Sequence, residues 1–116
     1  MMKNKYTNEQ QFHLVKRWFE ERGANVLKPK SGFANGVDLV AVTDKDALRV
    51  EIKKLYYASR AWKTKPVGKN RMNDDFIAVV FPCGYVFVER MEDHLKCCTK
   101  SGYRFFTVIL PPHIRE

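Results

Sequence analysis

Apolar and polar residues recur along this chain with two different periods, and the first of them is helical. Between Thr7 and Arg22, apolar residues three or four positions apart form one stripe: Phe12, Val15, Trp18 and Phe19. Thr7 is a suitable N-cap, and Gln10, three residues later, completes a capping-box pattern. Gly23 is suited to end the helix. We therefore predict an N-terminal helix over 7–22.

Short apolar runs typical of β-strands fill most of the remaining chain. We expect strands at 25–28, 36–42, 48–53, 76–81, 85–90 and 103–110, and a short helix at 91–98. The polar break 43–46 predicts a hairpin turn. Segment 54–62 is compatible with a continued strand or with the start of a helix, and the polar segment 60–71 predicts a loop. Residues 1–116 thus predict a single α/β domain with an N-terminal helix, a mixed β-sheet built around a central β-hairpin, and a short later helix.

Three charged residues stand in the predicted hairpin, where buried strands carry apolar ones: Asp38, Glu51 and Lys53. Side chains alternate across a strand, so Glu51 and Lys53 share a face. A turn centred on 44–45 places Asp38 opposite Glu51, and a turn centred on 45–46 places it opposite Lys53. The three groups meet in either register, because opposite Cβ atoms lie about 5 Å apart and diagonal ones ~7–8 Å.

Such a cluster favours a divalent cation. Two carboxylates side by side raise each other's pKa, and a cation removes that cost. Oxygen ligands in this number suit Mg²⁺, which takes one or two carboxylates and leaves room for a phosphate. A neighbouring lysine can orient or deprotonate a water molecule, or stabilise charge that develops on the phosphate.

The segment Gly36-Val37-Asp38 followed by Val50-Glu51-Ile52-Lys53 resembles the PD-(D/E)XK nuclease superfamily. That superfamily includes restriction endonucleases, archaeal Holliday-junction resolvases and some homing endonucleases. The matched segment covers 36–53, and Val37 replaces the proline of the motif. The resemblance implies a restriction-endonuclease-like core and Mg²⁺-dependent hydrolysis of DNA, with Mn²⁺ as an alternative cation. It implies that Asp38 and Glu51 hold the metal and that Lys53 is the motif lysine.

The resemblance also implies a glutamate on the first helix that reaches the metal. Glu9, in the first turn, is the expected residue, and Glu20 is the alternative. Another interpretation of Glu9 is an ordinary N-terminal glutamate that interacts favourably with the helix dipole.

Charge and composition point to a polyanionic partner. The formal net charge is +8 and the sequence pI about 9.5. The expected DNA-binding residues lie before Asp38 and in the basic segment 60–71: Lys30, Ser31, Arg60, Trp62, Lys63, Lys65, Lys69 and Arg71. We expect the basic side chains to contact phosphates and Trp62 to stack on a base or wedge into a duplex. The alternatives are a solvated loop and core packing of Trp62.

Several other features limit the cellular setting. The chain has no apolar run long enough to span a bilayer, and no apolar stretch follows its basic N-terminal residues, which predicts a cytoplasmic protein. The resemblance implies a bacterial, archaeal or phage-infected cell. Cys83, Cys97 and Cys98 form no CxxC pair, which favours reduced thiols over a zinc site. His94 is predicted at the surface. The adjacent acids Asp74 and Asp75 would point to opposite faces of a strand, so they are a poor rival metal site.

Three function classes follow. The first is an endonuclease, either structure-selective and junction-resolvase-like or belonging to a phage or mobile element. Cutting both strands of DNA needs two active sites, so we expect a homodimer. The second is a non-catalytic basic nucleic-acid-binding module in which Glu51 and Lys53 form a surface ion pair. The third is a structural or assembly protein whose charge neutralises nucleic acid.

Overall fold

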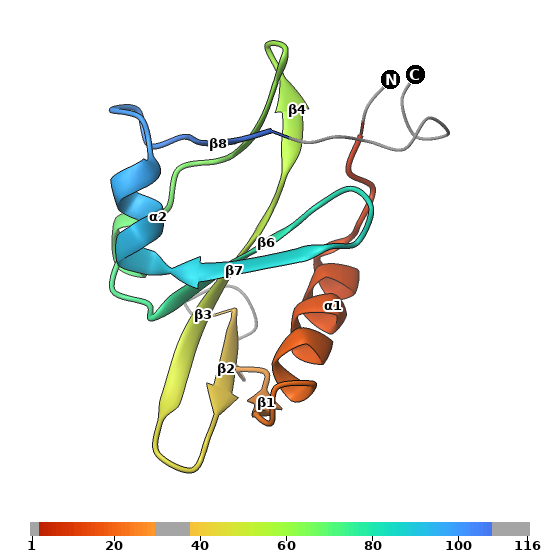
Figure 1. Cartoon of the computed structure of the whole chain (residues 1–116), viewed down its shortest axis with the longest axis vertical. Coiled ribbons are helices and arrows are strands. Elements are labelled where there is room, and N and C mark those ends of the chain that lie inside the picture. The colour runs from red at the N-terminus through yellow and green to blue at the C-terminus, as the bar shows by residue number, and fades with distance from the viewer. Residues whose placement is uncertain (1–2, 30–37, 108–116) are drawn as a thin grey trace.

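The computed structural model describes residues 3–29 and 38–107 (Figure 1). In chain order its elements are α1 (Asn8–Glu20), β1 (Asn25–Leu27), β2 (Leu39–Val42), β3 (Ala47–Lys54), β4 (Tyr56–Ala58), β5 (Ala61–Thr64), the 3₁₀ helix η1 (Lys69–Arg71), β6 (Phe76–Val80), β7 (Val86–Arg90), α2 (Met91–Cys97) and β8 (Arg104–Phe106). The α/β class, the N-terminal helix, the mixed sheet and the later helix are confirmed. Neither described helix is long and apolar enough to cross a membrane.

The larger sheet contains the predicted hairpin. Its strand order is β1-β2-β3-β6-β7, with β3 and β6 parallel and the other pairs antiparallel. In the β2–β3 hairpin Leu39 pairs with Val50, which corresponds to a turn centred on 44–45. Thr43 closes this turn, its backbone N–H donating to the Asp46 carbonyl at 2.8 Å. Asp38, immediately before β2, therefore lies opposite Glu51.

Helix α1 covers one face of this sheet. The Thr7–Gln10 capping box is present as predicted, and Gly23, with φ +90°, follows the helix. The apolar stripe of α1 packs on alternate residues of the strands, in a cluster that contains Phe12, Val15, Phe19, Leu39, Ala41, Val50, Ala78 and Val80. Each large apolar side chain buried here contributes roughly 1.5–3 kcal/mol. This packing fixes the orientation of α1 relative to the hairpin.

The opposite face of β6 packs on a second, smaller layer. Ile77 and Val79 point away from α1 and join a cluster with Leu55, Trp62, Val67 and Met91. The strands β4-β5-β8 form a separate antiparallel sheet over this cluster. Strand β6 is thus buried on both sides, which explains its nearly continuous apolar sequence.

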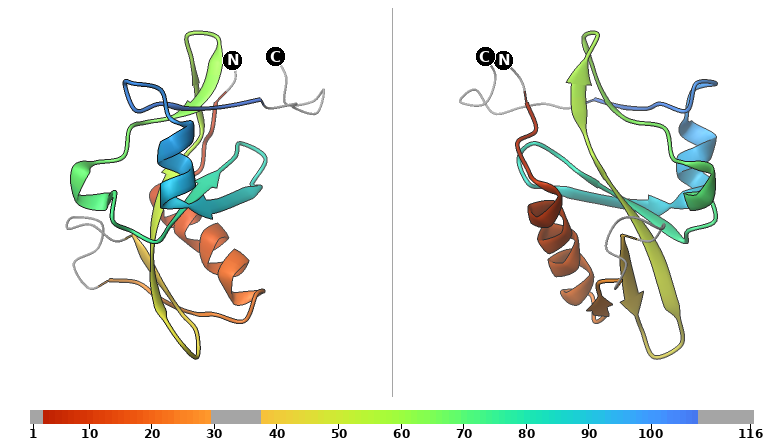
Figure 2. Two further views of the ribbon diagram at one scale, coloured as in Figure 1. Left: turned by 60° about the vertical axis from the view of Figure 1, so that its left-hand side comes forward. Right: turned by 180° about the vertical axis from the view of Figure 1, so that it is seen from behind.

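The prediction of a loop over 60–71 was wrong at its start, because 61–64 form β5. Ala58 pairs with Ala61, so Ser59 and Arg60 make a two-residue turn with φ of +52° and +64°. Turns of this geometry usually carry Asn-Gly or Gly-Gly, and here neither residue is glycine or asparagine. The sequence therefore lacked the usual hairpin signal. Figure 2 shows the β4–β5 hairpin reaching one end of the molecule in both views.

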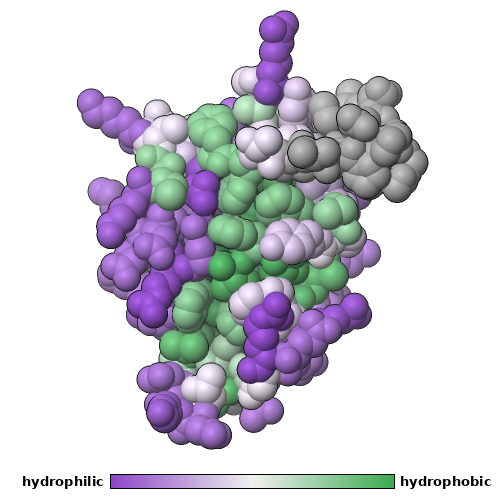
Figure 3. Space-filling view, viewed as in Figure 1, coloured by the Kyte–Doolittle hydropathy of each residue, from purple (hydrophilic) through white to green (hydrophobic). Residues whose placement is uncertain are grey.

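Strand β7 lies at the edge of the larger sheet. In the view of Figure 3, a continuous apolar area covers the face that β7 crosses, and hydrophilic side chains gather along its margins. A cavity of about 550 Å³ lies between α1 and β7, and Tyr85, 59% exposed, contributes to its wall. The charged hairpin residues belong to a different cavity.

Candidate active site

The hairpin brings three of the predicted site residues to one cavity. This cavity has a volume of about 190 Å³ and is lined by Asn8, Gln11, Asp38, Glu51, Ile52, Lys53 and Arg71. Asp38 enters from the residue before β2, and Glu51 and Lys53 enter from the same face of β3, two positions apart. The alternation of side chains in the strands accounts for the cluster.

Asp38 is held in place by the backbone of the neighbouring strand. The carboxylate is buried, and its Oδ2 accepts a hydrogen bond from the Ile52 N–H at 2.8 Å. That bond fixes the orientation of the side chain. It occupies one lone pair of Oδ2, so the carboxylate retains acceptor capacity toward the cavity.

Glu51 is the buried carboxylate of the site whose charge is least favoured. It is only 3% exposed, its Oε2 lies 3.7 Å from Lys53 Nζ, and its Oε1 lies 3.4 Å from Arg71 Nη1. Burial, then the hydrogen bond and negative charge of Asp38, raise the pKa of Glu51 to about 8, against the lowering effects of Lys53 and Arg71. Two nearby cations do not compensate the desolvated pair, so the site favours one further positive charge, either a proton or a metal ion.

Lys53 connects the cavity to the smaller layer. Its ammonium is partly exposed, and Nζ also donates to the Pro66 carbonyl at 3.4 Å. Pro66 lies in the connection between β5 and η1, and Arg71 lies in η1 itself. Both cationic partners of Glu51 are therefore positioned by backbone that follows the β4–β5 hairpin.

The helix contributes residues other than the expected glutamates. Glu9 and Glu20 are exposed and do not line the cavity, and Glu20 pairs with Lys16 at 3.4 Å. Gln11 and Asn8 line it instead. At about 100° per residue, Gln11 lies on the opposite flank of the buried stripe from Glu9. Gln11 is fixed by donation from its Nε2 to the Tyr6 carbonyl at 2.9 Å. No sequence signal indicated which flank faces the hairpin.

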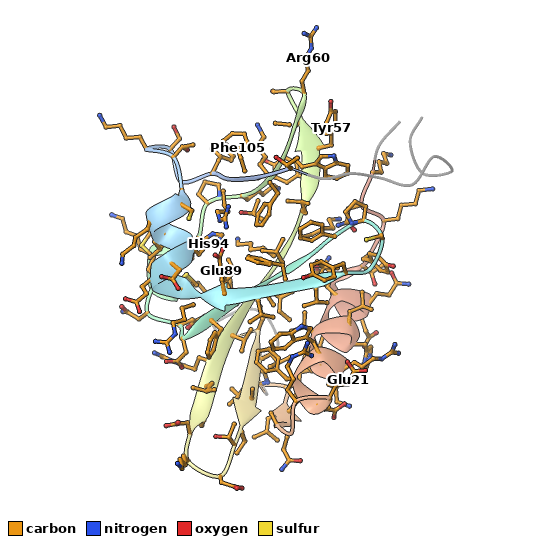
Figure 4. The ribbon with its side chains drawn as sticks, in the orientation of Figure 1. Glu21, Tyr57, Arg60, Glu89, His94 and Phe105 are labelled. Atoms are coloured by element: carbon orange, nitrogen blue, oxygen red, sulfur yellow. The ribbon has the colours of Figure 1, made fainter. Side chains whose placement is uncertain are left out.

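The predicted DNA-binding residues divide into separate groups. Arg71 reaches the cavity, whereas Lys65 and Lys69 are exposed outside it. Trp62 is 6% exposed and belongs to the second core, so the structure places it in the core, the alternative given above. Arg60 lies at the tip of the β4–β5 hairpin (Figure 4). Lys30 and Ser31 lie outside the described residues.

The predicted surface position of His94 was wrong. His94 is fully buried, and Figure 4 shows it on α2 facing Glu89 on β7, whose Oε2 lies 3.0 Å from His94 Nδ1. Arg104 donates to both oxygens of Glu89, at 3.2 and 3.3 Å. Burial is the largest cause of a lowered pKa of His94, and it outweighs the raising effect of Glu89. The histidine is therefore a neutral core residue.

Other candidate metal or thiol sites do not form among residues 3–29 and 38–107. In that part of the chain no group of three or more histidine, cysteine or acidic side chains is arranged to hold a metal, and the cysteines are free. Asp74 and Asp75 point in different directions: Asp75 accepts from the Arg49 N–H at 2.8 Å, and Asp74 is buried, with a pKa raised mainly by burial. The Asp38–Glu51 pair is thus the main carboxylate site of the described structure.

Comparison with known proteins identifies a solved structure with a similar fold. No family model and no curated protein matches the chain. Among solved structures, a bacterial homing endonuclease, I-Ssp6803I, is similar over 97% of this chain and 80% of its own, with a TM-score of 0.73 and 14% sequence identity. At this identity the likeness concerns the fold alone. The chain therefore shares the fold of this homing endonuclease, and its buried carboxylate pair lies in the central hairpin.

Proposed function

We propose that this protein is a metal-dependent DNA endonuclease of the PD-(D/E)XK type, with a restriction-endonuclease-like core. The observation that carries the proposal is the buried Asp38–Glu51 pair, with Lys53 beside it, in one cavity of a nuclease fold. Two adjacent desolvated carboxylates destabilise a structural ion network, because they repel each other and lose hydration, whereas the same pair supplies the ligands of a cation-binding site.

The donor set fits a hard divalent cation. Asp38 and Glu51 offer carboxylate oxygens in a cavity large enough for water and a phosphate oxygen as further ligands. The raised pKa of Glu51 indicates that the pair is short of positive charge. Mg²⁺ is the expected ion, with Mn²⁺ as a substitute. A bound cation would supply the neutralisation of charge on a phosphodiester.

The residues of the chain then have distinct tasks. Asp38 and Glu51 hold the cation, and the Ile52 N–H keeps Asp38 in place. Lys53, within 3.7 Å of Glu51, is positioned to orient an attacking water molecule or to stabilise negative charge on the phosphate. Arg71 balances the charge of Glu51 and can contact a neighbouring phosphate. Asn8 and Gln11 shape the helix side of the cavity.

DNA binding and dimerisation complete the proposal. The excess of basic residues supports a polyanionic substrate, and the exposed Arg60, Lys65 and Lys69 supply phosphate contacts outside the cavity. One cavity cuts one strand at a time, so for double-strand or junction cleavage we expect a homodimer. The length of this chain fits a nuclease of a phage or mobile element, or a junction-resolvase-like nuclease.

Cleavage of a panel of labelled DNAs tests the proposal. Linear duplex, single strand, flap and four-way junction are incubated with Mg²⁺, with Mn²⁺ or with EDTA. Wild-type protein is compared with Lys53→Ala and with Lys45→Ala, an exposed lysine at the turn of the same hairpin. We expect Mg²⁺-dependent cutting that falls by about 100-fold or more in Lys53→Ala and is retained in Lys45→Ala. Binding without cutting in either metal would refute the nuclease.

The ion pairs of Glu51 with Lys53 and Arg71 favour a second candidate, a non-catalytic nucleic-acid-binding module. In such a protein these contacts would be structural. Glu51→Ala separates the two: it abolishes cleavage and spares DNA binding in an endonuclease. In a binding module no cleavage exists to lose.

A further inference from the structure

The smaller sheet has two faces of different character. Its register aligns Tyr57 with Trp62 and Trp62 with Phe106, and this row packs into the second core. The adjacent row aligns Tyr56 with Lys63 and Lys63 with Phe105. Side chains alternate along each strand, so Tyr56, Lys63 and Phe105 point away from the core.

The outward row is an aromatic surface with a lysine at its centre. Phe105 is 43% exposed, and Lys63 Nζ lies 5.6 Å from the centre of its ring and 5.1 Å from that of Tyr103. Tyr56 pairs with Lys63 in the same row and is partly exposed, and partial burial followed by the neighbouring Tyr103 raises its pKa. Figure 4 shows Phe105 on β8, at the level of the β4–β5 hairpin that ends in Arg60. Three rings and an ammonium group thus share one face, hereafter the aromatic face.

The charge of the surrounding chain selects for a polyanion. Neither of the two segments that build this sheet, 52–73 and 94–107, contains a single Asp or Glu, although both are rich in lysine and arginine. The acidic residues of the protein lie elsewhere. The aromatic face therefore combines flat apolar rings with an excess of lysine and arginine, of which Lys53 and Arg71 pair with Glu51 and Arg104 pairs with Glu89. Aromatic rings among basic side chains are how proteins bind single-stranded nucleic acid.

A second cavity joins the aromatic face to the proposed active site. It has a volume of about 390 Å³ and shares Asn8, Gln11, Ile52 and Lys53 with the Asp38–Glu51 cavity. Its remaining lining residues are Lys54, Tyr56 and Lys65. Tyr56 belongs to both the cavity and the aromatic face. A strand whose phosphate lies at Asp38 and Glu51 can continue past Lys54 and Lys65 and reach the exposed rings.

We propose that the aromatic face binds unpaired nucleotides of the DNA substrate by base stacking on Phe105 and its neighbours. This inference rests on the proposed endonuclease function and specifies its substrate: DNA with a single-stranded segment beside the phosphate that is cut. Bases inside a duplex expose only their edges, so they cannot stack on these rings. Stacking contributes roughly 1–3 kcal/mol per base, which corresponds to a preference of about 5- to 150-fold for DNA with an unpaired segment.

Equilibrium binding in EDTA tests this inference without cleavage. Fluorescence anisotropy measures the affinity of the full chain for a blunt duplex, the same duplex with an oligo(dT) overhang, and oligo(dT) alone. Wild type should prefer the overhang. Phe105→Ala, and Phe105→Leu, which keeps an apolar side chain without a ring, should lose about 5-fold or more on the overhang and on oligo(dT). Both should keep the affinity for blunt duplex, and Phe105→Tyr should restore the preference.

Tyr85→Ala is the matched control, because Tyr85 is an aromatic residue that is 59% exposed on the turn between β6 and β7 and does not belong to the aromatic face. It should leave the ratio of overhang to duplex affinity unchanged. Equal affinities of wild type for blunt and overhang DNA, or an equal loss on all three DNAs in the Phe105 variants, would overturn the inference. Cleavage with Mg²⁺ is scored separately. Cleavage without an overhang preference would refute only base stacking on the aromatic face. An overhang preference without cleavage would refute the proposed endonuclease function.

Discussion

The raised pKa of Glu51 makes a quantitative prediction about folding stability. Glu51 has an ordinary pKa of 4.5 and a pKa of about 8 in the folded protein. The folded state therefore binds this proton more tightly than the unfolded chain does. The contribution of this proton to the free energy of unfolding is fully present below pH 4.5 and is lost as the pH rises through 8. In the absence of metal, the wild type should lose about 2 kcal/mol between pH 6 and pH 8 through this single group.

Substitution Glu51→Gln keeps the shape of the side chain and removes its charge. Urea unfolding of wild type and variant is measured at each pH from 5 to 9 in EDTA. The difference in the free energy of unfolding should grow in favour of the variant as the pH rises, by about 2 kcal/mol from pH 6 to pH 8. Comparison at each pH cancels the titration of other groups, His94 among them. Glu92→Gln, which changes an exposed glutamate, is the control and should give a flat difference.

Mg²⁺ should make the wild type more stable than Glu51→Gln. A cation that binds the Asp38–Glu51 pair stabilises the folded wild type by about 2.7 kcal/mol at a concentration one hundred times its dissociation constant. Glu51→Gln should gain much less. A difference between wild type and variant that does not change with pH would show that Glu51 is not desolvated beside Asp38. A pH-dependent difference that Mg²⁺ leaves untouched would refute the metal site.

Three further predictions concern the helix, the hairpin turn and the buried histidine. Gln11→Glu places a third carboxylate in the cavity and should lower the Mg²⁺ concentration for half-maximal cleavage. Glu9→Gln should leave cleavage unchanged, and a loss of cleavage in this variant would show that Glu9 contributes to the site. Ser59→Asn with Arg60→Gly should stabilise the left-handed turn by about 1 kcal/mol in thermal unfolding and weaken DNA binding, and Ser59→Asn alone should spare binding. Because burial lowers the pKa of His94, the wild type should lose stability relative to His94→Asn as the pH falls below 6.5, and equal acid sensitivity would contradict this.

Local patterns in the sequence determined much of the architecture. The helical stripe and capping box specified α1, and the alternation of side chains on either side of a short polar break specified the β2–β3 hairpin. That alternation also required Asp38, Glu51 and Lys53 to meet, because strand geometry fixes which residues share a face. The proximity of these three residues was therefore predictable from 36–53 alone.

The sequence could not show which flank of an element is covered by a distant one. Glu9 and Gln11 are both polar residues in the first turns of α1, and only the packing of Phe12 and Val15 on the sheet turns Gln11 toward the cavity. His94 has a polar neighbourhood in the sequence, yet Glu89 on β7 and Arg104 on β8 make its burial on α2 possible.

The same limit applies to two aromatic residues. Trp62 stands among basic residues in the sequence, which suggested nucleic-acid contact, whereas Phe105 stands in an apolar run for which only a strand was predicted. Tertiary pairing of β5 with β8 decides both positions: the row that contains Trp62 faces the core and the row that contains Phe105 faces solvent. The chain alone determined the alternation within each strand. Only the docking of the smaller sheet on β6 decided which side would be buried, because the apolar area removed from water depends on what lies opposite.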